Sequence, residues 1–128
     1  MDPEAVTRRL YEALAAGDLE AYRALIAEDV VFHVDGTSIV AGSHRGIDAV
    51  LRLGTLVIGE TGGTFRTDLR SVLANDSHAV VLHHWTAERR GRRISMDNVN
   101  VYRFENGLVA ERWEVIADQE EHDAFWAG

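Results

Sequence analysis

The sequence contains no cysteine and no lysine, although thirteen of its 128 residues are basic. The absence of cysteine excludes disulfide bonds, thiolate metal ligands and a cysteine nucleophile. All thirteen basic residues are arginine, which excludes Schiff-base catalysis through a lysine amine. The six histidines follow no spacing that is typical of a metal site. We therefore expect a protein that works without a metal or another cofactor.

Positive charge and long apolar runs are also scarce. The net charge of −8 disfavours nucleic-acid binding, which needs a basic surface. No run of about 18 apolar residues occurs, so we expect no membrane segment. The acidic first residues do not resemble a signal peptide, and we expect a cytoplasmic protein. Four arginines gather at 89–93, where we expect a solvated turn that protects the edge of a sheet.

A length of 128 residues fits a single domain over 1–128. Asp2 followed by Pro3 is typical of a helix start, and Ala16-Gly17-Asp18 ends this helix and begins another. A strand at 30–34, a loop at 42–46, a helix at 47–58 and a tail helix from Asp118 follow. Helices that precede a run of strands are typical of the α+β class.

The segment 64–117 predicts four antiparallel strands, because turn residues divide it at intervals suited to strands. If Arg90 and Gly91 form a two-residue loop, His83 pairs with Asn98. Strand side chains alternate between faces. One face of this hairpin then carries His83, Trp85, Met96, Asn98, Asn100 and Tyr102.

The register of the last strand depends on the loop near the Asn-Gly pair at 106–107. A three-residue loop places Glu114 and Arg112 on the face that carries His83. A two-residue loop shifts the strand by one residue and brings Trp113 and Val115 to that face instead. Under the first register that face carries a row of His83, Asn98 and Glu114, with Asn100 and Arg112 adjacent.

This polar face has two possible surroundings. It lines an internal site, or it faces solvent or a second subunit while the opposite side forms the core. In the second case the core would contain Leu82, Val99, Val101, Val109, Trp113 and Val115. Alternation alone supports both hypotheses.

Five segments together resemble the SnoaL-like and ketosteroid-isomerase-like branch of the nuclear-transport-factor-2-like superfamily. They are LAAGDLE at 14–20, IAEDV at 26–30, GSHRGIDAV at 42–50, VYRFENG at 101–107 and VAERWE at 109–114. The resemblance implies a cone-shaped α+β fold, with N-terminal helices packed on a strongly curved antiparallel sheet that encloses an apolar pocket. It also implies homodimers through the sheet, and it favours a polar face that lines the pocket.

The resemblance also assigns candidate residues. Asn100 stands where ketosteroid isomerases carry an acidic oxyanion donor, and their base aspartate falls around His33 and Asp35. Glu114 resembles the catalytic carboxylate that SnoaL-type cyclases and limonene-type epoxide hydrolases carry on the last strand. The epoxide hydrolases also need an arginine–aspartate pair, and here Arg66 and Asp68 lie one strand too early.

We therefore expect Glu114 and His83 to move protons, with His33 and Asp35 as a further base at the mouth of the pocket. Asn98 and Asn100 would stabilise an oxyanion. The residues expected to hold the substrate are Tyr11, Leu53, Trp85, Met96, Tyr102 and Arg112.

Two classes of function follow from these residues. The first is a cofactor-independent acid/base enzyme for an apolar carbonyl compound: an isomerase, a polyketide-type cyclase or a dehydratase. The alternative is a non-catalytic domain that binds a hydrophobic small molecule or dimerises, or an enzyme that resembles the epoxide hydrolases. A fold alone does not decide between them.

Overall fold

Two helices open the chain, and both begin where the sequence predicts. In the computed structural model, which describes residues 2–128, α1 spans Pro3–Ala16 and α2 spans Leu19–Ala24. The side chains of Asp2 and Asp18 each accept a hydrogen bond from a backbone amide in the first turn, which confirms both caps. Gly17 ends α1 in a left-handed conformation, with φ of 67°.

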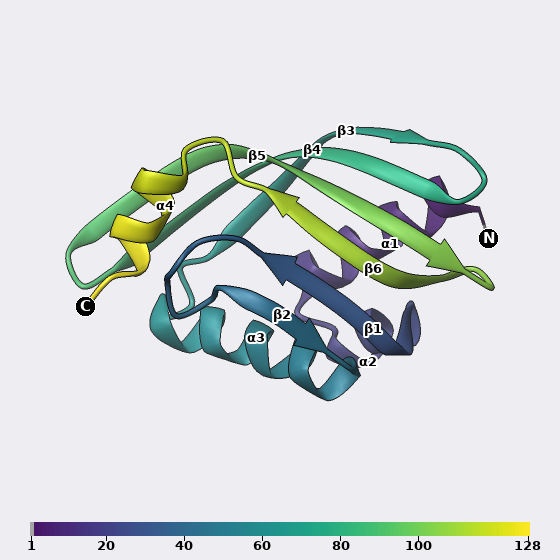
Figure 1. Ribbon diagram of the computed structural model, residues 1–128, viewed down its shortest axis with the longest axis horizontal. Coiled ribbons are helices and arrows are strands. Elements are labelled where there is room, and N and C mark those ends of the chain that lie inside the picture. The colour runs from purple at the N-terminus through teal and green to yellow at the C-terminus, as the bar shows by residue number, and fades with distance from the viewer. Residues whose placement is uncertain (1) are drawn as a thin grey trace.

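The strands form one six-stranded sheet that curves over the helices (Figure 1). They are β1 Ile26–Val34, β2 Gly42–Arg45, β3 Arg66–Ala74, β4 His78–Arg89, β5 Arg92–Glu105 and β6 Leu108–Val115. Their order is β2-β1-β6-β5-β4-β3, and β1 runs parallel to β6 while the other neighbours are antiparallel.

The beginning of the sheet differs from the prediction. β1 is longer than the expected strand at 30–34, because residues before it also pair with β6. Residues 42–45 pair with β1 as the edge strand β2, where a loop was expected. This segment is polar and mostly exposed, so it lacks the apolar alternation that marks a half-buried strand.

The helices lie on the concave side of the sheet (Figure 1). α1 packs against β3 and β4, whereas α3, Ile47–Glu60, packs against β1 and β2. The last helix, α4, spans Gln119–Trp126 and lies beside the hairpin of β4 and β5. N-terminal helices on one face of a curved, unclosed sheet confirm the predicted α+β class.

The register between β4 and β5 confirms the prediction. Arg90 and Gly91 form the two-residue loop, with φ of 51° and 77°, and His83 pairs with Asn98. Positive φ at both central residues matches the twist of the flanking strands. The loop thereby determines which face of the hairpin turns inward.

The two-residue loop between β5 and β6 confirms the second predicted alternative as far as Val109, but a β-bulge follows, so neither predicted register holds beyond it. Ala110 is the extra residue of β6 at the bulge. An extra residue reverses the alternation, which turns Glu114 to the concave face as the three-residue loop would have done. Its partner is Asn100 rather than the expected Asn98, because loop and bulge together shift the strand by two residues.

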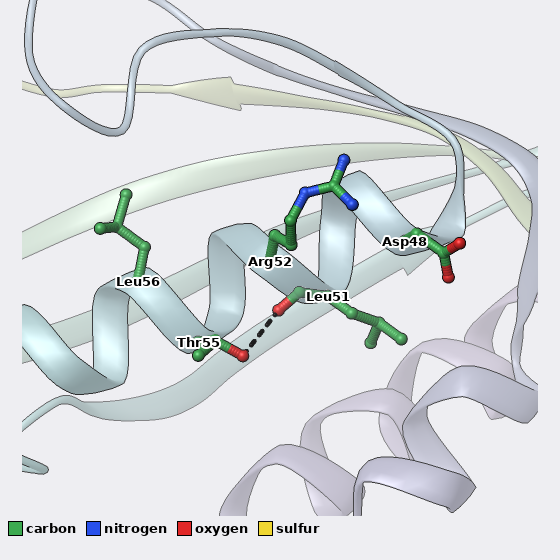
Figure 2. A pocket seen from close by; sticks show the side chains of 5 residues that line it. All are labelled: Asp48, Leu51, Arg52, Thr55 and Leu56. Atoms are coloured by element: carbon green, nitrogen blue, oxygen red, sulfur yellow. Dashed lines mark hydrogen bonds between the residues drawn. The ribbon is translucent and has the colours of Figure 1, made fainter.

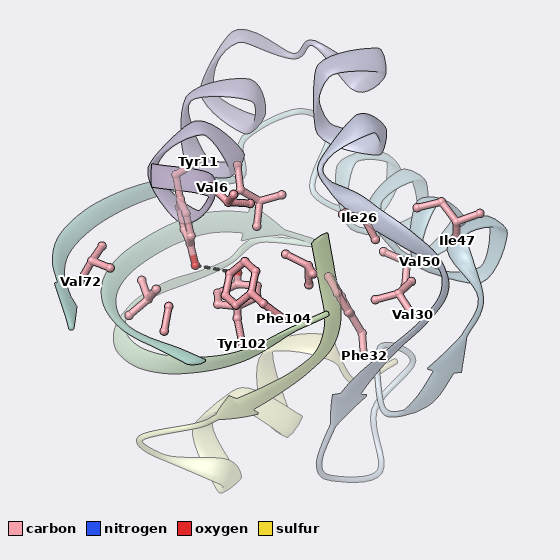
Figure 3. Packing of buried hydrophobic residues seen from close by; sticks show 14 residues of the cluster. Val6, Tyr11, Ile26, Val30, Phe32, Ile47, Val50, Val72, Tyr102 and Phe104 are labelled. Atoms are coloured by element: carbon pink, nitrogen blue, oxygen red, sulfur yellow. Dashed lines mark hydrogen bonds between the residues drawn. The ribbon is translucent and has the colours of Figure 1, made fainter. Parts of the chain in front are cut away.

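Buried apolar side chains form two clusters on the concave side. The first lies around α1 and the start of α3, and Figure 3 shows its packing. It includes Val6, Leu10, Tyr11, Val30, Phe32, Val50, Val81 and Tyr102. The second lies around α4 and includes Leu53, Trp85, Met96, Phe125 and Trp126. The expected substrate-holding residues Leu53, Trp85 and Met96 therefore lie in the packed second cluster.

The convex face of the sheet carries apolar side chains in two rows. Leu82, Val99 and Val115 are neighbours on β4, β5 and β6. Val80, Val101 and Trp113 form the next row. Leu82 and Val115 are 41% and 53% exposed, so this face is not the core. The hypothesis that the polar face points outward is therefore wrong.

The arginine-rich hairpin tip holds the C-terminal segment, which corrects the expectation of a solvated turn. Arg89 is buried, and its Nε and Nη2 donate to Oε1 of Glu60 at 2.9 and 2.7 Å. Its Nη1 donates to the carbonyl of Ala127 at 2.7 Å, and Arg92 donates to the same carbonyl. These guanidinium groups satisfy carbonyls that the end of α4 leaves unpaired.

Candidate active site

A row of polar side chains crosses the concave face between the two apolar clusters. We call His83, Asn98, Asn100, Arg112 and Glu114 the polar row. His83 pairs with Asn98, and Asn100 pairs with Glu114 on the next strand. His83, Asn98 and Asn100 are 4%, 1% and 2% exposed, and the Glu114 side chain is 16% exposed. Burial of such groups costs free energy unless each finds a partner.

Arg112 brings a cation into this row. It pairs with Tyr102 rather than with the expected Asn100, and its guanidinium carbon lies 4.3 Å from the centre of the Phe32 ring. No carboxylate among residues 2–128 forms a salt bridge with it. Burial disfavours its charge and is the largest single influence, but the fields of Glu114 and of the neighbouring tyrosines together outweigh it and raise the pKa of Arg112, which stays protonated.

Several buried polar atoms of the interior lack a hydrogen-bond partner within the described part of the chain. In the polar row they are His83 Nε2, Asn98 Nδ2, Asn100 Oδ1 and Arg112 Nε. In and beside the second cluster they are Trp85 Nε1, His122 Nδ1 and Trp126 Nε1. Native proteins seldom leave buried polar groups unpaired, so these atoms indicate a place for water or a ligand.

His83 is uncharged at neutral pH. Burial lowers the pKa of His83 from 6.5 to about 4, although the field of Glu114 opposes part of this shift. Its Nδ1 lies 3.1 Å from Oγ1 of Thr67, which leaves Nε2 as the nitrogen without a partner. A neutral imidazole with one free nitrogen is able to take up a proton or to donate one.

Tyr11 connects α1 to the polar row through Asn100, and Figure 3 shows it beside Tyr102. Its hydroxyl lies 3.0 Å from the hydroxyl of Tyr102 and accepts a hydrogen bond from Nδ2 of Asn100 at 2.9 Å. Burial raises the pKa of Tyr11, which keeps the phenol protonated. The two tyrosines expected to hold substrate therefore lie together, and they orient the amide of Asn100.

His122 on α4 also reaches the row, although it was not among the residues expected from the sequence. It is 2% exposed, and its Nε2 lies 3.6 Å from Oε1 of Glu114. Its Nδ1 lies 3.9 Å from Oδ1 of Asp123. Burial lowers the pKa of His122 below its ordinary value. A position three residues before the buried Phe125 was the available signal, because that spacing places both side chains on one helix face.

The structure does not bring His33 and Asp35 to the polar row. His33 lies on the convex side, where its Nε2 is 2.6 Å from Oε2 of Glu111 and its ring stacks on Trp113. Its Nδ1 is 2.9 Å from Oγ of Ser43. Asp35 is exposed in the turn after β1. The expectation of a base at the mouth of an internal pocket therefore finds no geometric support, because alternation turns His33 away from Glu114.

The arginine–aspartate pair of an epoxide-hydrolase-like site is also outside the interior. Arg66 and Asp68 are exposed on β3, while Thr67 between them contacts His83. Adjacent strand residues point to opposite faces. Arg66 and Asp68 therefore point away from the polar row, on the opposite face of the sheet from Thr67.

A shallow concavity of about 540 Å³ lies on the outer side of α3 (Figure 2). Asp48, Leu51, Arg52, Thr55 and Leu56 line it. Thr55 donates its hydroxyl hydrogen to the carbonyl of Leu51, so this side chain is already paired. The concavity offers one arginine and one aspartate at the surface, without the buried unpaired groups of the interior.

Residues 2–128 contain neither a metal-binding cluster nor a membrane-spanning helix. No group of three or more histidine or acidic side chains is arranged to hold a metal ion. No helix in this range is long and apolar enough to cross a membrane.

The comparisons with known proteins agree with the fold. A family model described as "SnoaL-like domain" matches residues 7–112. The structure of Bal32a, from a soil-derived mobile gene cassette, is similar over 97% of this chain and 95% of that chain, with 35% identity and a TM-score of 0.94. A comparison with curated proteins finds no match.

Two similar structures come from proteins described by ligand or activity. TerC, crystallised with polyporic acid, is 17% identical over 94% of this chain and 95% of that chain, with a TM-score of 0.83. IdmH from Streptomyces antibioticus, described as a candidate polyketide cyclase, is 20% identical over 91% of this chain and 93% of that chain, with a TM-score of 0.76. At these identities the likeness shows a shared fold.

Proposed function

The chain belongs to the SnoaL-like domain family, within the nuclear-transport-factor-2-like superfamily, and from this premise we propose that it is a cofactor-independent acid/base enzyme. Its substrate is an apolar carbonyl compound, and its reaction is an isomerisation, a cyclisation or a dehydration. The polyporic acid of TerC and the cyclase description of IdmH belong to those proteins, and they support a small-molecule ligand here.

The buried polar row is the observation that carries the proposal. Glu114 removes a proton from the carbon next to the carbonyl and returns it to another position of the substrate. His83 is neutral above about pH 4 and serves as the second proton carrier. The free amide hydrogen of Asn98 stabilises the enolate oxygen. The Asn100 amide nitrogen already bonds Tyr11, so Asn100 orients the substrate through its free Oδ1.

Deuterium exchange of a model ketone tests this proposal. 2-Tetralone, a bicyclic apolar ketone, should exchange its α-hydrogens with D₂O faster when the protein is present, as followed by proton NMR. Glu114→Gln should slow this catalysed exchange at least about 100-fold while 2-tetralone still binds. Glu111→Gln is the matched control, since Glu111 lies on the same strand but on the convex face. Equal exchange with the wild-type protein and Glu114→Gln would favour a non-catalytic binding domain.

We also propose that two copies associate through the convex face of the sheet. The two rows of apolar side chains on β4, β5 and β6 support this arrangement, because exposed apolar rows of this kind are typical of subunit contacts. The polar row lies on the other face, so association leaves the interior site intact.

A further inference from the structure

The unpaired atoms of the interior are mainly hydrogen-bond donors. Asn98 Nδ2, Arg112 Nε, Trp85 Nε1 and Trp126 Nε1 all carry hydrogens and cannot accept. Asn100 Oδ1 is the one acceptor in this set, and the two imidazole nitrogens take either role. An occupant that satisfies these atoms therefore needs several oxygen lone pairs. A neutral, purely apolar ligand would leave them unsatisfied.

Arg112 adds a charge requirement to this donor surplus. Its guanidinium lies over the Phe32 ring, and no carboxylate of residues 2–128 forms a salt bridge with it. Arg112 is half-buried, and a cation that loses part of its water without a salt-bridge partner is unfavourable. Glu114 acts on Arg112 through its field but not within salt-bridge distance. The planar guanidinium also matches the two oxygens of a carboxylate or of a delocalised enolate.

We propose that the interior site selects an organic oxyanion attached to an apolar ring system, with the negative charge placed at Arg112. The apolar body lies between the two clusters, and Asn98 binds a second oxygen of the ligand. This inference rests on the proposed function for the position of the site, but it concerns ligand selection and does not require catalysis.

The polar row suits such an anion better than the surface concavity does. Arg52 at the concavity is exposed to solvent, and Asp48 lies on the same rim. An ion pair between a ligand and an exposed arginine contributes little to affinity. Asn98 and Asn100, in contrast, are fully buried with one free polar atom each. The protein as a whole carries a charge of −8, so a local cation favours the binding of an anion at this position over the rest of the protein.

A matched pair of probes tests the proposal on the full-length protein. 2-Naphthoate and 2-naphthamide have the same ring and almost the same shape, but only the first is an anion. We expect 2-naphthoate to bind at least about tenfold more tightly in isothermal titration calorimetry. Arg112→Gln should abolish this preference, and Arg112→Lys, which keeps the charge, should retain part of it. Arg52→Gln is the control for the concavity and should leave the preference unchanged.

The outcomes separate this inference from the proposed function. Equal affinities for the two probes, or a preference that survives in Arg112→Gln, would overturn the inference, and a preference lost in Arg52→Gln would assign it to the concavity. Circular dichroism should first show that each variant is folded. If Arg112→Gln is unfolded, a reduced preference in Arg112→Lys tests the inference in its place. If the preference is absent while exchange of 2-tetralone still depends on Glu114, the inference fails and the proposed function stands. If the preference depends on Arg112 but Glu114→Gln still exchanges 2-tetralone at the wild-type rate, the inference stands and the proposed function fails.

Discussion

His122 Nε2 lies 3.6 Å from Oε1 of Glu114, so the C-terminal helix contacts the carboxylate that β6 carries into the interior. The imidazole is buried, and its other nitrogen faces Asp123 at 3.9 Å. The geometry restricts the rotation of the Glu114 side chain from one side. Orientation of a reacting group in this way affects the rate of proton transfer more than it affects the affinity for substrate.

We expect His122→Gln to slow the exchange of 2-tetralone about tenfold at saturating ketone. The dissociation constant of the ketone should change much less than the exchange rate, because glutamine keeps much of the volume that the imidazole places beside Trp85 of the second cluster. His84→Gln is the control, since His84 bonds Asp97 on the convex side. A weaker affinity together with an unchanged exchange rate would contradict the orienting role.

The stability of the protein should depend on pH through His83. Burial lowers its pKa from 6.5 to about 4. Between these values the unfolded chain binds a proton that the folded protein excludes. The free energy of unfolding should therefore fall as the pH decreases from about 6.5 to about 4, by roughly 3 kcal/mol in total. The contribution is complete above this range and lost below it.

Urea denaturation at a series of pH values measures this dependence. His83→Gln should flatten the decrease, since glutamine does not titrate, whereas His84→Gln on the convex side should retain it. Glu114 and Arg112 face His83 from β6 with opposing fields, and His122 is shifted in the same direction as His83. Some slope should therefore remain in the His83 variant. An unchanged slope would show that folding does not lower the pKa of His83.

Arg89 should contribute strongly to stability. Arg89→Gln removes the paired hydrogen bonds to Glu60 and the bond to Ala127, so we expect a loss of about 3 kcal/mol in the free energy of unfolding. Amide hydrogen exchange should become faster in α4 before the rest of the chain. Arg93→Gln is the matched control on the same hairpin: its side chain is 75% exposed, and it should change stability by less than about 0.5 kcal/mol. Similar losses in both variants would contradict the role of Arg89.

The proposed dimer should dissociate when the convex face becomes charged. Leu82→Arg places a cation within one of the two apolar rows, and sedimentation velocity should show a monomer at concentrations where the wild-type protein is a dimer. Leu19→Arg on α2 adds the same charge at an exposed position away from the sheet and should leave the dimer intact. A wild-type protein that is monomeric throughout, or a Leu82→Arg dimer, would exclude this interface.

Local signals predict much of the fold. Asp2, Asp18 and Asp118 cap their helices because a short acidic side chain accepts a hydrogen bond from the first turn. The Arg90–Gly91 loop determines the register of β4 and β5, because a two-residue loop of this type is compatible with one pairing. These features depend on residues that are close in the sequence.

Features that depend on distant residues were not predictable in the same way. Nothing in the residues around Ala110 marks the bulge, since its neighbours on both sides suit a regular strand. The burial of Arg89 depends on Glu60 and on the C-terminal carbonyls, far away in the sequence. His33 was placed at the pocket mouth by resemblance, and the parallel pairing of β1 with β6 turns it to the convex side.

The bulge at Ala110 means that the chemistry of the interior depends on how the residues of β6 pair as well as on their types. Deleting Ala110 would remove the unpaired residue, restore regular pairing and leave Glu114 and Arg112 on the concave face, because their partners on β5 would not change. A strand that kept Ala110 but paired it regularly would instead turn Glu114 and Arg112 outward and bring Trp113 and Val115 into the interior. Such a protein would lack the carboxylate and the cation of its interior, although neither residue had been substituted. Related chains that keep the length of this strand but lose the bulge are therefore expected to have purely apolar binding interiors.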